Sequence, residues 1–576
     1  MCGIVGYVGK KINLQTAIKT LKKLEYCGYD SAGIAFIQDK GISAIKELNS
    51  INNLINKAEG LQGKICICHT RWATHGEVNI TNAHPQISYN NNFAVVHNGI
   101  IENYKELKAQ IGEENFISQT DTEVVANLLE KQEGTTLNRV ISVCEQLKGR
   151  FAIAIIDERG KSIYLAKRNN PLYVAKTAGG YIVASDISCI DATEYYSLED
   201  NMVAQVDRFK ATFYLNGQLI KLDPIKKNYS AEQISLNGYN HFMEKEIAET
   251  ASVIKNISTR YESMFNKLFE PDMFKNFSRI CFIGCGTSYH ASLLGASWLK
   301  NKTGINAEAC VASEYRYNNP IIDEKTLLIL VSQSGETADT LAVAEMAKSK
   351  GATIYAITNA EHSTIVNFAQ KVFPTCAGPE IAVASTKAYS AMLAVMYLLA
   401  NCQSPFTELA KNLVKAAELI SNEIDANIVD VVKASKRIFF IGRVDDGVTS
   451  QEAALKLKET AYLDTYGYYA GELKHGPIAL IEPGIVVCAI VTSESLKSKT
   501  LNAVEEVKSR GATTIIVTDD LSIQGDYTIR IPQIDVQELK SLLAVIPFQT
   551  LAYKVTCGLN QNPDQPRNLA KSVTVE

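Results

Sequence analysis

Two segments in the second half of the chain repeat each other, and this repeat limits the fold more than any other feature. KSKGATIYAIT at 348–358 returns as KSRGATTIIVT at 508–518, an offset of 160 residues. Each copy reads as a helix end, a glycine stop and an apolar strand. Upstream, ICFIGCGTSYHAS at 280–292 and IFFIGRVDDGVTS at 438–450 both read as a strand, a loop and a helix. The pattern predicts two tandem α/β units with parallel sheets and ligands at the carboxyl ends of the strands.

The first 222 residues have a different pattern. Short alternating strands are indicated by KICICHT, AVVHNGI, SIYLAKR and YIVASD, with few helices between them, which is typical of an α+β domain with antiparallel pairing. We expect this domain at 1–222, a linker rich in Pro, Asn and Ser at 223–240, and the two α/β domains at 241–420 and 421–576.

Composition excludes several classes of function. Lys+Arg 58 against Asp+Glu 62 gives a net charge of −4, so nucleic acid and anionic membranes are not expected partners. The longest apolar tract, Ala388–Cys402, is shorter than the roughly twenty residues that cross a bilayer. The thirteen cysteines are odd in number without a C-x-x-C pair, and the eight histidines form no ligand pattern. We therefore expect a cytoplasmic protein with no metal and no cofactor.

The start of the chain, MCGIVGY, offers a nucleophile. Removal of Met1 leaves Cys2 with a thiol and a free α-amine, and an amine with a pKa of about 7.7 to 8.0 can take the proton of the thiol. The plain alternative is an incidental cysteine beside an apolar strand.

Further motifs follow Cys2 in order: RWATHG at 71–76, NAHP at 82–85, HNG at 97–99 and TDTE at 120–123. Each has an ordinary explanation. Asn98-Gly99 is typical of a hairpin turn, Thr120 with Glu123 forms a capping box, and an isolated Arg71 is usually a surface charge.

Together with GYDSAG, these motifs resemble the glutamine amidotransferase domain of the N-terminal-nucleophile type. The resemblance implies that Cys2 attacks the glutamine amide and that Asn98 with the N–H of Gly99 forms the oxyanion hole. It also implies the groups that bind glutamine: Arg71 for the carboxylate, Asp121 for the amino group, Thr74 and His75 in a covering loop, and Trp72 as the gate of an ammonia channel. Cys27 and Gln86 depart from the usual family residues, which are Arg and His.

In LLILVSQSGETADT a buried strand is followed by hydroxyl side chains and a helix that we expect to begin near Glu336. Hydroxyls and free N–H groups at such a junction suit an anion, and the absence of a P-loop lysine favours a small phosphate ester over ATP. An ordinary Ser-capped turn is the alternative. The candidate phosphate ligands are Ser332, Gln333, Ser334 and Thr337.

At the offset of 160 this loop aligns with TSESLK at 492–497, where Glu494 replaces Ser334 and the glycine is lost. A carboxylate there repels phosphate. We therefore expect only the first copy to bind the ester.

Acid–base candidates lie in the second copy. Glu452, Lys456 and Glu459 in TSQEAALKLKET are spaced at i, i+4 and i+7, so they share one helix face, while Lys458 points elsewhere. A solvated, salt-bridged helix face has the same spacing.

The loops, with CGTS at 285–288 and VAST at 383–386, resemble the sugar isomerase domains of the glutamine:fructose-6-phosphate aminotransferase family, as does the tail DQPRNLAKSVTVE. The resemblance covers nearly the whole chain, and it adds sugar-phosphate ligands at Cys285, Gly286, Thr287, Ser288, Val383 and Ser385. It implies that Glu459 moves a proton between sugar carbons 1 and 2, with Lys456 beside it. The resemblance further implies that His475 of a neighbouring subunit opens the sugar ring, hence a homodimer, and that Lys571 forms a Schiff base with the open-chain ketose. When the resemblance is set aside, His475 is interpreted as an exposed loop residue with no catalytic role, and Lys571 as a mobile charge near the end of the chain.

The resulting expectation is an enzyme that uses glutamine and fructose 6-phosphate to make glucosamine 6-phosphate and glutamate. Two alternatives share the scaffold: a deglycase that removes amines from sugar phosphates, and a sugar-phosphate sensor without catalysis. Retention of Cys2, Glu459, His475 and Lys571 argues against the sensor, and the complete glutaminase set argues against the deglycase. Tyr466, where the family often has an acid, is a further departure.

Overall fold

The computed structural model describes residues 2–25, 28–38, 41–72, 76–226, 235–270, 272–401, 407–420 and 424–574. The chain divides into two compact units, Met1–Ile234 with Ala570–Glu576, and Ser235–Leu569. The C-terminal segment that carries Lys571 is therefore grouped with the first unit.

The first unit contains two antiparallel sheets, as the alternating strands predict. One sheet has the order β15-β11-β9-β10-β1-β4-β2-β3, and the other β14-β13-β12-β8-β7-β6-β5. The strands of the first sheet are β1 (Gly3–Asn13), β2 (Ser31–Gln38), β3 (Gly41–Leu48), β4 (Gln62–Arg71), β9 (Tyr173–Thr177), β10 (Gly180–Ala184), β11 (Glu194–Ser197) and β15 (Ile225–Lys226). Those of the second are β5 (Gln86–Ile87), β6 (Phe93–Ile101), β7 (Gly149–Asp157), β8 (Ser162–Arg168), β12 (Met202–Asp207), β13 (Ala211–Leu215) and β14 (Gln218–Ile220).

The two sheets pack face to face in this unit. One apolar core joins Ile4 and Ile67 of the first sheet to Val96 and Ile156 of the second. The opposite face of the second sheet packs on the helices α3 (Tyr104–Ile111), α4 (Thr122–Lys131) and α5 (Thr136–Gln146). The helices α1 (Leu14–Lys22) and α2 (Ile51–Lys57) contact the first sheet. The side chains of Asn13 and Ser50 cap these two helices, as expected of polar residues just before a helix.

The second unit contains two five-stranded parallel sheets of the same order, β17-β16-β18-β19-β20 and β22-β21-β23-β24-β25. The repeat in the sequence is thus a repeat in structure. The strands of the first repeat are β16 (Arg279–Gly284), β17 (Asn306–Val311), β18 (Thr326–Ser332), β19 (Thr353–Thr358) and β20 (Lys371–Pro374). Those of the second are β21 (Ile438–Gly442), β22 (Thr465–Tyr469), β23 (Val486–Val491), β24 (Thr513–Thr518) and β25 (Tyr527–Arg530).

Helices cover both faces of each sheet. They are α6 (Phe242–Ala248), α7 (Thr250–Leu268), α8 (Thr287–Thr303), α9 (Ala312–Tyr315), α10 (Ala338–Ser349), α11 (Lys387–Ala400), α12 (Thr407–Leu419), α13 (Ala426–Ala434), α14 (Asp445–Ala461), α15 (Lys497–Lys508) and α16 (Lys540–Gly558). α10 begins at Ala338, two residues after the expected Glu336. Two residues of the expected linker, Ile225–Lys226, pair with β11.

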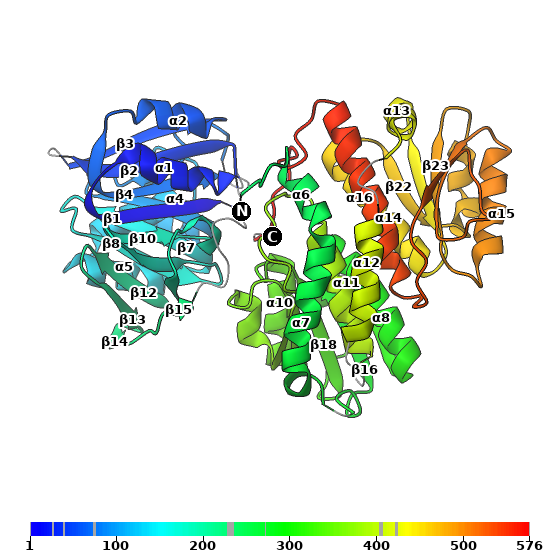
Figure 1. Cartoon of the computed structure of the whole chain (residues 1–576). Helices are drawn as coiled ribbons and strands as arrows, with labels where there is room; N and C mark the ends of the chain where they lie inside the picture. Colours follow the sequence, from blue (N-terminus) through cyan, green and yellow to red (C-terminus); the bar gives the residue numbers. More distant parts are fainter. Residues whose placement is uncertain are drawn as a thin grey trace. The chain divides into compact units, whose positions relative to one another are not determined.

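One hydrophobic core extends through both repeats. It joins Phe282 of the first sheet to Phe440 of the second through side chains of α8, α11, α14 and α16. The helices α14 and α16 run side by side in this core (Figure 1). The apolar tract at 388–402 supplies α11, which is buried along almost its whole length. None of the helices in the described ranges is long and apolar enough to cross a membrane.

Candidate active sites

The first site forms at the ends of two neighbouring strands. Gly3 of β1 pairs with Thr70 of β4, which brings Cys2 beside Arg71 and Trp72. The N–H of Trp72 donates to the Cys2 sulfur at 3.2 Å. Burial raises the pKa of the Cys2 thiol, while that N–H and the Arg71 guanidinium act in the opposite direction. A thiol with a raised pKa needs a base before it can attack.

Asn98 is oriented by a buried histidine. The Nε2 atom of His69 lies 2.9 Å from the carbonyl of His97 and 3.1 Å from Asn98 Oδ1. Both partners are acceptors, so Nε2 carries the proton, and burial lowers the pKa of His69 to about 3, which keeps the ring neutral. The amide nitrogen of Asn98 is thereby turned to the carbonyl of Cys2, to which it donates at 2.7 Å. His69 was not predicted from the sequence.

Gly99 lies inside β6, paired with Phe151 of β7. The hairpin alternative for Asn98-Gly99 is therefore wrong. The φ of Gly99 is +123°, and a Cβ atom here would lie 2.0 Å from the carbonyl oxygen of Arg150. Only glycine fits this position, beside the Asn98 amide.

Two buried charged groups complete this cluster. Arg71 is 4% exposed and Asp121 is 5% exposed, so the reading of Arg71 as a surface charge is wrong. Burial lowers the pKa of Arg71, while Cys2, Asp30 and Asp121 raise it. The Oδ2 atom of Asp121 accepts from the N–H of Ile101 at 2.7 Å. A cation and a carboxylate beside a thiol match the two charged ends of an amino acid.

The predicted capping box at Thr120 and Glu123 and the unusual residue Gln86 also lie in this unit. The capping box does not form, because the Glu123 carboxylate accepts from the N–H groups of Ile117 and Ser118. Gln86 is buried and donates to the carbonyls of Thr81 and Ala83, which holds the loop before β5. Cys27, Thr74 and His75 lie outside the described residues.

The second site forms at the carboxyl ends of β16 and β18, which are neighbours in the first parallel sheet. The loop after β16 carries Cys285 and Gly286, and Thr287 and Ser288 follow as the first residues of α8. The loop after β18 carries Gln333 and Ser334 between Ser332 and Thr337. The hydroxyls of Ser332 and Thr337 lie 2.9 Å apart, and Ser332 Oγ also accepts from the N–H of Gly335 at 3.0 Å. The hydroxyls therefore gather where the helix α10 begins.

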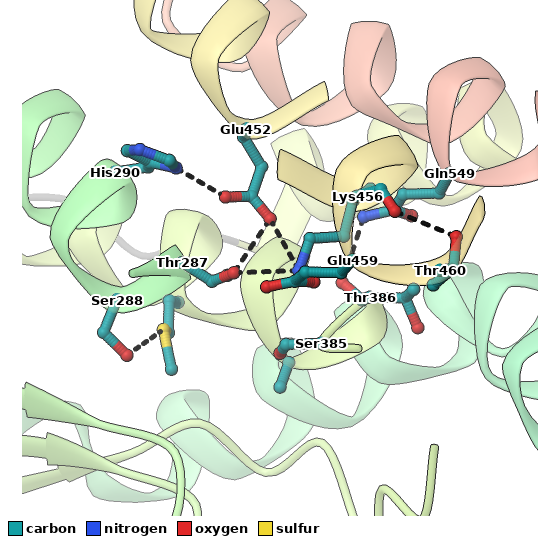
Figure 2. Close-up of polar contacts among 12 residues, drawn as sticks. Thr287, Ser288, His290, Ser385, Thr386, Glu452, Lys456, Glu459, Thr460 and Gln549 are labelled. Atoms are coloured by element: carbon teal, nitrogen blue, oxygen red, sulfur yellow. Dashed lines mark hydrogen bonds and ion pairs between the residues drawn. The ribbon is translucent and has the colours of Figure 1, made fainter. Parts of the chain in front are cut away.

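Acidic and basic side chains from the second repeat reach this loop. Lys456 of α14 is fully buried, and its Nζ lies 2.7 Å from Glu459 Oε2 and donates to Thr287 Oγ1 at 3.0 Å (Figure 2). Thr287 in turn donates to Glu452 Oε1 at 3.0 Å. Burial alone would lower the pKa of Lys456, but Glu452 and Glu459 raise it above its usual range. The face is buried and joined to the first repeat, so the solvated-face alternative is wrong.

Ser385 and Val383 are held by neighbouring chain segments. Ser385 Oγ donates to Glu380 Oε2 at 3.1 Å, and the other oxygen of Glu380 accepts from the N–H groups of Thr386 and Ala388 at the start of α11. The N–H of Val383 donates to the carbonyl of Asp564 at 3.0 Å. The carboxylate of Asp564 accepts from the first N–H groups of α6, which ties the stretch of chain that follows α16 to this loop.

The structure places His475, Lys571 and Tyr466 as follows. His475 is exposed at the end of a short 3-10 helix, Glu472–His475. Lys571 belongs to the first unit by its contacts. Tyr466 stacks on Phe439 and Tyr468 in the second sheet, so its aromatic ring packs where the family often has an acid.

In the second repeat a buried carboxylate occupies the loop that corresponds to the candidate phosphate loop of the first. Asp446 aligns with Ser288 and is 2% exposed, and its Oδ2 atom accepts from the N–H groups of Thr492 at 3.0 Å and Ser493 at 3.3 Å. Val444 has φ +50°, close to the +53° of Gly286, so the two turns share one conformation. Glu494 is exposed and pairs with Lys497. The carboxylate inside the second loop is therefore that of Asp446.

Asp446→Asn is expected to change the pH dependence of stability. Burial raises the pKa of Asp446 to about 6, against hydrogen bonds from Thr492 and Ser493 that lower it. The folded state thus holds this proton more tightly than the unfolded chain, so its stabilising effect is complete below about pH 4 and is lost as the pH rises through 6. A shift of two units corresponds to about 3 kcal/mol.

Thermal melts of the variant and the wild type at pH 4.5 and pH 8 test this. We expect the difference in melting temperature, variant minus wild type, to be a few degrees larger at pH 8 than at pH 4.5. Asp272→Asn, at an exposed aspartate, shows no such change. An equal difference between Asp446→Asn and wild type at both pH values contradicts the prediction.

Comparison with known proteins identifies the domain families to which the two halves of the chain are similar. The glutamine amidotransferase domain family matches residues 69–192, and the SIS domain family matches residues 273–402 and 432–556. The C-terminal domain of glucosamine-fructose-6-phosphate aminotransferase from Francisella tularensis is 30% identical, with a TM-score of 0.54 over 58% of this chain and 100% of that chain. A glucosamine-6-phosphate deaminase from Thermotoga maritima, 24% identical with a TM-score of 0.50 over 58% of this chain and 100% of that chain, shares the fold.

Full-length relatives extend the match over the whole chain. The glutamine--fructose-6-phosphate aminotransferase (isomerizing) of Clostridium tetani is 39% identical over 609 residues, and that of Fusobacterium nucleatum is 41% identical over 612 residues. Each match covers 100% of this chain and 100% of the relative. The chain belongs to the glutamine--fructose-6-phosphate aminotransferase family.

Proposed function

We propose that this chain hydrolyses glutamine and uses the ammonia to convert fructose 6-phosphate into glucosamine 6-phosphate. The observation that carries the proposal is that one chain holds both sites. Cys2 lies beside Arg71 and Asn98, and the ion pair of buried Lys456 with Glu459 lies beside the hydroxyl groups of the first repeat. The substrates are thus glutamine and fructose 6-phosphate, and the products are glutamate and the amino sugar phosphate.

At the first site, Cys2 attacks the side-chain carbonyl carbon of glutamine. Arg71 and Asp121 bind the carboxylate and ammonium groups of the substrate, and Asn98 with the N–H of Gly99 donates to the oxyanion. The α-amine of Cys2 takes the thiol proton and passes it to the leaving ammonia. Water then hydrolyses the thioester and releases glutamate.

At the second site, the loops at 285–288 and 332–337 bind the phosphate, and Val383 and Ser385 contact the sugar. Lys571 forms an imine with the open-chain ketose, and ammonia displaces the lysine. Glu459 then moves a proton from carbon 1 to carbon 2, with Lys456 holding its carboxylate. We place His475 of a second subunit at ring opening, which requires a homodimer. A cytoplasmic location fits the described cysteines, which are all free thiols.

The decisive experiment is glucosamine 6-phosphate formation by the purified protein from glutamine and fructose 6-phosphate. The deglycase alternative has support only at the level of the fold, from the deaminase of Thermotoga maritima. A deglycase releases ammonia from the amino sugar phosphate without making it from glutamine. A sensor binds the sugar phosphate and forms neither product, so the same assay separates all three.

Thr337→Ala is expected to weaken fructose 6-phosphate binding about tenfold, because it removes one hydroxyl of the pair at the start of α10. Ser495→Ala, in the loop that Asp446 occupies, changes the affinity less than twofold. Calorimetric titration of both variants with fructose 6-phosphate measures the two constants. Equal weakening by both substitutions contradicts a single phosphate site in the first repeat.

A further inference from the structure

A buried contact between the two repeats involves a histidine that the proposed chemistry does not use. His290 lies on α8 of the first repeat, and its Nδ1 atom is 2.7 Å from Glu452 Oε2 on α14 of the second repeat (Figure 2). The Glu452 side chain is 0% exposed, whereas that of His290 is 14% exposed. The contact therefore lies at the edge of the core, with its carboxylate fully inside.

The two oxygens of Glu452 have different partners. Oε2 faces His290, while Oε1 accepts from Thr287 at 3.0 Å and lies 3.4 Å from Lys456 Nζ. Burial alone would raise the pKa of Glu452, but Lys456, His290 and Thr287 together lower it below its usual range. The carboxylate is thus kept ionised by groups from both repeats.

Lys456 is shared between competing acids. Its ammonium group contacts Glu459 at 2.7 Å and Glu452 at 3.4 Å, and the charge of Glu380 also acts on it. Acidic groups thus outnumber this one lysine. Without a donor at Oε2, only Thr287 and Lys456 would stabilise the negative charge of Glu452. The Lys456 ammonium group would then be drawn away from Glu459.

We propose that His290 is a positioning residue for the isomerase reaction, which acts through Glu452. By holding Oε2, His290 leaves Oε1 aimed at Thr287 and leaves Lys456 in contact with Glu459. It thereby fixes the position of the Glu459 carboxylate, which transfers the proton. The His290 side chain itself does not touch the sugar. This inference rests on the proposed function of Glu459.

Three variants test the role of the donor. His290→Leu keeps a side chain of similar bulk but has no donor, and His290→Asn keeps an N–H group at the place of Nδ1. His362→Leu makes the same change at an exposed histidine of the first repeat and is the matched control. The measurements are kcat and KM for fructose 6-phosphate in amino sugar formation, with basal glutamine hydrolysis in the same preparations.

We expect His290→Leu to lower kcat about ten- to a hundredfold, because the loss of a hydrogen bond to a buried charge is large. KM for fructose 6-phosphate changes less than threefold, and glutamine hydrolysis is unchanged. His290→Asn restores kcat to within about fivefold of wild type, and His362→Leu equals wild type. If His290→Leu does not fold, His290→Ala with and without added imidazole replaces it, and imidazole raises its kcat.

Several results overturn the proposal. A kcat of His290→Leu within twofold of wild type shows that no positioning is needed. A raised KM with normal kcat assigns His290 to substrate binding, and equal losses in the Leu and Asn variants show that the donor is not the cause. If the wild type itself makes no amino sugar phosphate, the proposed function is wrong and the role of His290 is wrong with it. The wild-type assay therefore distinguishes this outcome from a failure of the His290 role alone.

Discussion

Cys2→Ala abolishes glutamine hydrolysis, with an expected loss of at least about a thousandfold. The variant has no nucleophile, and no other described thiol lies in the Arg71, Asn98 and Asp121 cluster. Binding of fructose 6-phosphate stays within twofold of wild type, because the loops at 285–288 and 332–337 that bind the phosphate belong to a different compact unit from Cys2. Glutamate release and calorimetric titration with the sugar phosphate measure the two properties.

Cys144→Ala is the matched control. Cys144 is a cysteine of the same unit on α5, outside the site, and its replacement is expected to leave both properties unchanged. An equal loss of sugar binding in Cys2→Ala contradicts the independence of the two sites.

Lys571→Arg is expected to lose glucosamine 6-phosphate formation by at least about a hundredfold while basal glutamine hydrolysis survives. Arginine keeps the positive charge, but its guanidinium remains protonated and cannot form an imine. Borohydride added with fructose 6-phosphate traps a covalent adduct on the C-terminal peptide of the wild type and not of the variant. Product assay and peptide mass spectrometry are the measurements.

Lys458→Arg, on α14 with its ammonium group over the Tyr466 ring, is the control for a Lys→Arg exchange and retains activity. A mobile tail charge would tolerate the exchange at 571 as well. Full activity of Lys571→Arg, or an adduct on Lys456 in the wild type, rules out the Schiff-base role.

The sequence predicts what depends on local periodicity. The alternation in SIYLAKR and YIVASD predicts strands, and the repeat at an offset of 160 predicts two tandem α/β units with parallel sheets. Both parallel sheets are present, and their strands have the same order. The spacing of Glu452, Lys456 and Glu459 places them on one face of α14, and Lys456 lies within reach of both glutamates. These features follow from the geometry of a single helix or strand.

Features that depend on distant partners are not visible in the sequence. Asn98-Gly99 has the residues of a hairpin turn, but pairing with β7 keeps both inside a strand. His290 meets Glu452 only because the two repeats pack together, 162 residues apart along the chain. The carboxylate of Asp446 enters the loop at Thr492 because the turn before α14 copies that before α8, even with valine in place of glycine.

The core that extends through both repeats determines how precisely the side chains of the second site are positioned relative to one another. Thr287 and His290 lie on α8, and Glu452, Lys456 and Glu459 lie on α14, and both helices pack in that one interior. Close-packed protein interiors resist compression and transmit strain, so we expect neither helix to shift without its neighbours. If the two repeats had separate cores, a hinge or a closing segment would be needed to bring the acidic side chains of one repeat into contact with the hydroxyl groups of the other. Here the register is a property of the resting protein, set when the chain folds and before any sugar arrives.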